Sequence, residues 1–154
     1  MNPEFSLSAF LPETTTAPER RTPAQTVTEY VLTYRKWARE CHDRARDNRD
    51  RIAELQRGEA RKVLTQIQAL YCTSRNRQHQ RASTGYYFLG GTYDAADEIE
   101  TECFTTRSSA QVITMQVKNR HPSFRFTLRR KGGIWRIDSL EKQTGPDHWI
   151  SDIL

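Results

Sequence analysis

Carboxylates and phenols are the residue types in this 154-residue chain that could do chemistry. Three glutamates alternate along one predicted strand, and a general acid–base enzyme could combine such a carboxylate with a tyrosine. The phenols that a pocket between helices and sheet could use are Tyr30, Tyr34, Tyr86 and Tyr87. The glutamates and Asp138, however, fall on strand faces opposite the apolar ones. The sequence therefore disfavours catalysis, with a small-ligand enzyme as the alternative.

Metal, nucleotide and hydrolase chemistry find no support in the motifs. The four histidines, His42, His79, His121 and His148, lie in four different predicted elements, and no pair has metal-ligand spacing. The chain has no P-loop, no GxGxxG and no GxSxG. Cys41, Cys72 and Cys103 are odd in number and lack CxxC spacing, so we expect buried free thiols. We expect no metal and no cofactor.

Two clusters of like charge could instead recognise a partner. Five carboxylates lie within nine residues, and three of them should project from one face of a single strand. Three arginines follow the second predicted helix in a loop that could grip phosphate. The acidic stripe consists of Asp94, Asp97, Glu98, Glu100 and Glu102, and the arginine loop contains Arg75, Arg77 and Arg81. The alternative is that both are ordinary solvated surfaces.

Composition limits the class of protein. The chain is 36% hydrophobic and 28% charged, and its formal net charge is +5. No apolar run reaches membrane length, and the opening residues lack the pattern of a secretory signal, so we expect a cytoplasmic protein. The basic excess lies in residues 19–81. A basic nucleic-acid-binding module is thus a further alternative, although charged helices are usually solvated and nucleic acid is disfavoured as a partner.

A β-hairpin is predicted for residues 124–143. Apolar residues alternate with polar ones on both sides of Gly132-Gly133, a pair that suits a two-residue turn. If Lys131 faces Ile134, then Leu128 faces Ile137 and Phe126 faces Ser139, which keeps the apolar face continuous. We therefore interpret Asp138 as a structural or surface carboxylate. The predicted core residues of this region are Phe124, Phe126, Leu128, Trp135 and Ile137, with Met115 from the preceding strand.

Three more strands are predicted before this hairpin, and the end of the chain offers a further element. Residues 85–89 form a short aromatic strand, and the glutamates alternate with Ile99, Thr101 and Cys103 in the next. Ile113, Met115 and Val117 should form the buried side of a third, with Met115 facing Phe126. The tail, residues 145–154, offers a last short strand or an edge cover.

Helices precede all of these strands. Residues 1–21 are rich in Ser, Thr, Pro and Glu, and we expect a disordered tail. Thr22, Pro23 and Gln25 have the spacing of a helix start with a capping box. Apolar residues then recur at helical spacing, and a second helical face ends at Tyr71. Residues 22–154 should therefore form a single α+β domain, with the helices packed on one face of an antiparallel sheet.

Several short motifs resemble one family. These are KGGIWRIDSLEKQ at residues 131–143, a tryptophan shortly before the C-terminal leucine, LYCTSRNR at 70–77, GTYDAADEI at 91–99, and a first helix containing Trp37 and Glu40-Cys41. Over roughly residues 24–154 the chain is similar to the nuclear-transport-factor-2-like immunity proteins of bacterial polymorphic toxin systems. The resemblance implies a cone-shaped fold in which a curved sheet wraps around a long helix.

The resemblance also implies a function: a non-catalytic protein that binds and blocks a cognate toxin domain encoded by the adjacent gene. The lack of a signal-peptide pattern favours a toxin that acts in the cytoplasm. The same fold elsewhere carries isomerases and dehydratases, so the fold does not decide between them. We expect the toxin to contact the acidic stripe, since inhibitors complement the charge of the site they occlude. The arginine loop and the aromatic anchors Tyr86, Tyr87 and Trp149 are the alternatives.

Overall fold

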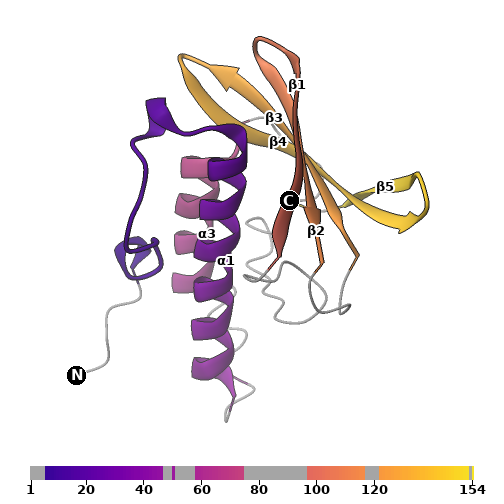
Figure 1. Cartoon of the computed structure of the whole chain (residues 1–154). Coiled ribbons are helices and arrows are strands. Elements are labelled where there is room, and N and C mark those ends of the chain that lie inside the picture. Colours follow the sequence, from indigo (N-terminus) through magenta and orange to yellow (C-terminus); the bar gives the residue numbers. More distant parts are fainter. Residues whose placement is uncertain (1–5, 47–49, 51–57, 75–96, 117–121, 153) are drawn as a thin grey trace.

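Two long helices lie side by side, and a five-stranded sheet curves past one side of them (Figure 1). The structure, a computed structural model, describes residues 6–46, 50, 58–74, 97–116, 122–152 and 154. The helices are α1 (Pro23–Ala45) and α3 (Glu59–Tyr71), preceded by the 3-10 turns η1 (Leu7–Ala9) and η2 (Pro18–Arg20). The strands are β1 (Glu98–Thr106), β2 (Ser109–Met115), β3 (Phe124–Lys131), β4 (Ile134–Gly145) and β5 (His148–Asp152). They are antiparallel neighbours in chain order, so the α+β prediction is confirmed.

The start of α1 has the predicted capping box. The Gln25 backbone N–H donates to the Thr22 hydroxyl at 3.1 Å, and the Gln25 side chain accepts from the Thr22 backbone N–H at 2.9 Å. Pro23 occupies the first helical position, where its missing N–H costs no hydrogen bond. These contacts fix where α1 begins relative to the sheet.

The core lies between α1, α3 and the sheet. The apolar stripe of α1 is buried as predicted, and the Trp37 indole N–H donates to the Ala60 carbonyl of α3 at 3.0 Å. Cys41 and Cys72 are buried free thiols, whereas Cys103 is exposed, which corrects the prediction for that residue. The predicted restart of the second helix before residue 58 and the aromatic strand at 85–89 lie outside the described residues.

The N-terminal segment does not behave as the expected tail. From residue 6 onward it runs along the helices (Figure 1), where η1 contacts α3 and η2 contacts β4. Phe10 is buried, and the Thr16 N–H donates to Glu29 of α1 at 2.8 Å. Arg21 is buried too, where its guanidinium reaches Glu29 at 3.3 Å and lies over the Tyr71 ring at 4.9 Å. The buried side chains of Phe10 and Arg21 hold this otherwise polar segment against the helices, so the prediction of a disordered tail is wrong from residue 6 onward.

The β3–β4 hairpin has the predicted turn, but not the predicted register along its whole length. Gly132 and Gly133 both have positive φ, Lys131 faces Ile134, and Leu128 faces Ile137. A β-bulge then follows, so Phe126 faces Leu140 and not Ser139. Asp138 is the extra residue of this bulge. The five predicted core residues of the hairpin are nevertheless buried.

The predicted buried face of β2 was wrong. Val112 faces Phe126, so Ala110, Val112 and Thr114 are buried, while Met115 is 44% exposed. Val112 and Ile113 are adjacent β-branched residues, and either could start an apolar alternation. The pairing of β2 with β1 and with β3 determines which alternation is buried, and it buries the side chains on the Val112 face. Val117 lies outside the described residues.

Candidate binding surface

The acidic segment coincides with an edge of the described sheet. All nine residues of β1 are exposed, and its paired neighbour is β2. Opposite β2, the register shifts between Ile99 and Thr101, so Glu100 is an extra residue that lies between two consecutive paired positions. Such a bulge inverts the alternation of side chains on its two sides. The expectation that three glutamates project from one face is therefore wrong.

The glutamates on the two sides of the bulge have different surroundings. Glu98 faces Met115, on the sheet face away from α1, whereas Glu102 faces Val112, on the face toward α1. The Glu102 carboxylate accepts a hydrogen bond from the Ala24 backbone N–H at 2.8 Å. A carboxylate at a helix N-terminus satisfies an orphan donor and complements the helix dipole. Glu102 thus attaches β1 to α1, while Glu98 and Glu100 remain on the exposed strand.

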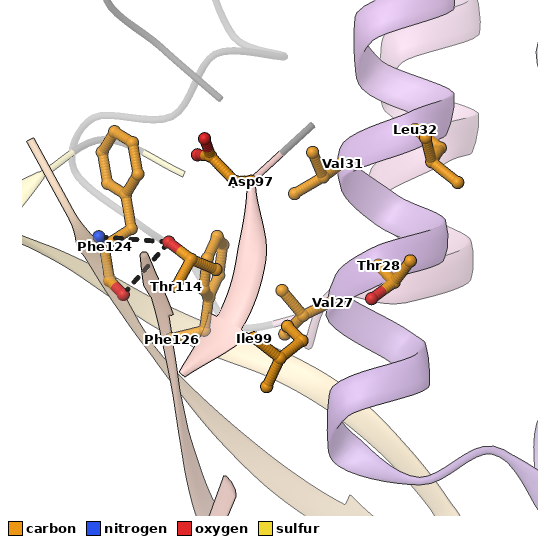
Figure 2. Close-up of a pocket in the computed structure, with 9 residues that line it drawn as sticks. All are labelled: Val27, Thr28, Val31, Leu32, Asp97, Ile99, Thr114, Phe124 and Phe126. Atoms are coloured by element: carbon orange, nitrogen blue, oxygen red, sulfur yellow. Dashed lines mark hydrogen bonds between the residues drawn. The ribbon is translucent and has the colours of Figure 1, made fainter. Parts of the chain in front are cut away.

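A pocket opens between α1 and the start of β1. The space between these elements amounts to about 340 Å³, a figure that includes open solvent, so the pocket is a partly open depression. Figure 2 shows Val27 and Val31 pointing from α1 toward Ile99 and Phe126 on the strands. Thr28 and Leu32 also line the pocket from α1, and the exposed Thr28 marks its mouth. The nine lining residues are Val27, Thr28, Val31, Leu32, Asp97, Ile99, Thr114, Phe124 and Phe126.

The wall of this pocket is mainly apolar. Six of its nine residues are aliphatic or aromatic, and the Thr114 hydroxyl is engaged with the Phe124 backbone (Figure 2). It accepts from the Phe124 N–H at 3.3 Å and donates to the Phe124 carbonyl at 3.5 Å. Asp97 supplies the one carboxylate among the described lining residues. The pocket therefore suits an apolar group close to acidic residues.

Sequence reasoning found the members of this pocket separately, not as a site. The predicted apolar stripe of α1 contains Val27 and Val31, and the acidic stripe contains Asp97. The missed residues are Thr28, Leu32 and Thr114, the last because the other face of β2 was expected to be buried. The spacing of four between Thr28 and Leu32, next to the identically spaced Val27 and Val31, makes a second stripe on the same side of the helix. These two adjacent stripes are the feature of the sequence from which the helix side of the pocket could have been predicted.

The remaining predicted contact residues divide into two groups. Asp94, Arg75, Arg77, Arg81, Tyr86 and Tyr87 lie outside the described residues. Trp149 is on β5, half-buried, with the Arg125 guanidinium over its ring at 4.7 Å. Arg125 also forms a bidentate pair with Glu141, at 3.0 and 2.9 Å. Trp149 is thus packed into a ladder across β3, β4 and β5, well apart from β1 in the strand order.

Asp138 joins three parts of the chain. Its carboxylate accepts from the Thr73 hydroxyl at 2.8 Å and pairs with Arg129 Nε at 3.3 Å. Thr73 follows α3, and its backbone N–H donates to the Ile137 carbonyl at 2.8 Å. Asp138 is 5% exposed, so these partners stabilise a carboxylate that would be costly to bury alone. The contacts support a structural role.

Burial is the main cause of the shifted side-chain pKa values of Cys41 and Tyr71. Burial raises the pKa of the Cys41 thiol from 9.0 to about 12, with a smaller contribution from Glu40. Burial also raises the pKa of Tyr71. Within the described residues, no group of three or more His, Cys, Asp and Glu is placed to hold a metal ion. No helix in the described part of the chain is long and apolar enough to cross a membrane.

A comparison with protein families shows to which family this chain belongs. A family described as NTF2 fold immunity protein matches residues 22–153, which is most of the chain. The chain belongs to this family. Searches of curated proteins and of solved structures gave no match. As an immunity protein, it belongs to a class whose members bind a toxin partner, and its binding surface is therefore the relevant site.

Proposed function

We propose that this immunity protein neutralises a cognate toxin domain by binding it over β1 and the adjoining end of α1 and occluding it. Family membership supports the general role. The observation that carries the location is the coincidence of an exposed acidic strand with an open apolar pocket. Stable protein interfaces combine an apolar centre with a polar rim, and this surface has both.

Charge supports the choice of β1 over other surfaces. The chain as a whole carries +5, yet β1 contains three glutamates and no lysine or arginine. Asp97 precedes it directly, and Glu98 and Glu100 are exposed. A partner with a basic surface, such as the cleft of a nuclease, would be attracted to this side and oriented by it. Trp149 is a weaker candidate because it already packs against Arg125.

In this proposal the toxin is encoded by the adjacent gene, and the two proteins meet in the cytoplasm. The three free cysteines, of which Cys103 is exposed, fit a reducing compartment. The pocket lining gives the enzyme alternative little support. The described residues that line it include one carboxylate, that of Asp97, and no tyrosine or histidine.

Co-expression tests the proposal. Cells producing the C-terminal domain of the adjacent toxin gene should survive only when this protein is present. The double variant Glu98→Lys with Glu100→Lys should abolish protection while the melting temperature stays nearly unchanged, because both side chains are exposed.

The matched control reverses two other exposed glutamates. Glu13→Lys with Glu19→Lys changes the net charge equally, at exposed positions outside β1 and outside the pocket lining, and should protect like the wild type. Full protection by the β1 double variant would rule out this surface. If the wild-type protein does not protect against the toxin domain, the proposed function itself fails.

A further inference from the structure

The pocket beside β1 leaves apolar surface in contact with water. Ile99, in its wall, is 36% exposed, and Leu32, which also lines it, is half-buried. The pocket lies over well-packed residues, since Phe124 and Phe126 at its base are at most 1% exposed. A concave apolar site on a rigid base is the kind of place where interface hot spots form.

The charges around the pocket restrict the chemistry of what can enter. Asp97 lines it, and Glu98 and Glu100 flank Ile99 on the exposed strand, with Glu98 on the sheet face away from α1. None of the nine described lining residues is basic. An apolar group flanked by acidic groups would meet repulsion here, whereas one flanked by lysine or arginine would gain favourable charge pairs with the carboxylates beside the pocket and along the strand edge.

We infer that the pocket receives one apolar side chain of a partner protein, flanked by basic residues that meet Glu98 and Glu100. This inference rests on the proposed function for the identity of the partner, the toxin domain. It adds what the acidic strand alone does not specify, namely an apolar anchor and its place between α1 and β1. The carboxylates then steer and orient the partner, and the buried side chain prolongs the life of the complex.

The first test needs no toxin. Three short peptides, acetyl-Lys-Leu-Lys-amide, acetyl-Lys-Ala-Lys-amide and acetyl-Glu-Leu-Glu-amide, are titrated into protein with ¹³C-labelled methyl groups. The Lys-Leu-Lys peptide should shift the methyl signals of Val27, Val31 and Ile99 saturably. The alanine and glutamate versions should bind much more weakly, since one lacks the anchor and the other the complementary charge. Equal shifts with all three peptides, or no saturable shift with the first, would overturn the inference.

A blocking variant links the pocket to the toxin. Thr28→Trp places a large side chain at the mouth from an exposed helical position, so folding should be preserved. It should remove the Lys-Leu-Lys response and weaken toxin binding by about 30-fold, as for a lost hot spot. Gln66→Trp, at an exposed position of α3 outside the pocket, is the matched control and should leave both unchanged.

The outcomes separate this inference from the proposed function. If Thr28→Trp binds the toxin domain like the wild type while the Glu98 and Glu100 reversals abolish binding, the anchor is wrong and the acidic surface stands. If the peptides bind as expected but the wild-type protein does not neutralise the toxin domain, the pocket chemistry stands and its partner is another basic protein.

Discussion

The centre of the sheet and its β1 side differ in how their residues are constrained. β3 and β4 have a paired strand on each side and helices against one face, and their bulged carboxylate, Asp138, is buried between partners. β1 lies at the edge of the described sheet, and its bulge is exposed. Carboxylates at the centre are thus committed to folding. At β1, the Glu102 carboxylate holds the strand to α1, whereas the exposed Glu98 and Glu100 are available to a partner.

The largest expected difference between the two regions concerns apolar packing. Phe126→Ala should lower the free energy of unfolding by about 3–5 kcal/mol, because the ring is fully buried. Phe104→Ala on β1 should cost only about 1 kcal/mol, since the ring is 56% exposed and touches Trp135 along one edge. Urea unfolding measures both. Equal losses would show that β1 is as firmly packed as the centre.

Alkaline pH tests the burial of Cys41 on α1. The pKa of Cys41 is about 12 in the folded state and 9.0 ordinarily, so the unfolded chain loses this proton first as pH rises. The stability that this group contributes is complete below pH 9 and is lost toward pH 12, by about 1.4 kcal/mol per pH unit. Cys41→Val should remove this part of the alkaline loss in urea unfolding at a series of pH values. An alkaline loss that is the same in Cys41→Val and in the wild type would contradict the burial of this thiol.

Substitution of Asp138 tests how much the bulge between β3 and β4 contributes to stability. Asp138→Asn keeps the shape of the side chain but weakens the pair with Arg129, and we expect a loss of about 1–2 kcal/mol in the free energy of unfolding. Arg129 is largely exposed, which limits the contribution of the ion pair itself. A variant that unfolds like the wild type would mean that Asp138 does not hold the Thr73 segment in place.

The smallest effect is expected at the link between β1 and α1. Glu102→Gln can keep the hydrogen bond to the Ala24 N–H but loses the charge near the helix N-terminus, which should cost about 0.3–1 kcal/mol. Glu98→Gln, without this contact, should change the melting temperature less. A larger effect of Glu98 would contradict the assignment of the two glutamates to different faces.

The same comparison explains which features could be predicted from the sequence. The capping box at Thr22 and the Gly132-Gly133 turn depend on neighbouring residues, and both were predicted correctly. The two bulges were not, because an extra residue in a strand is selected by pairing with distant chain segments. Asp138 is held by Thr73, and Glu102 by Ala24, contacts that no local pattern contains. The pocket depends on these long-range placements and could not be assembled from the sequence.

Hydrogen exchange of the complex with the toxin domain tests the central claim most directly. Amide exchange should slow on binding at the start of β1, around residues 98–102, because the toxin covers this exposed edge. Exchange in β4 and β5 should change little. Protection confined to β4, β5 or α3, with β1 unchanged, would contradict the claim that this immunity protein binds its partner over β1 and the adjoining pocket.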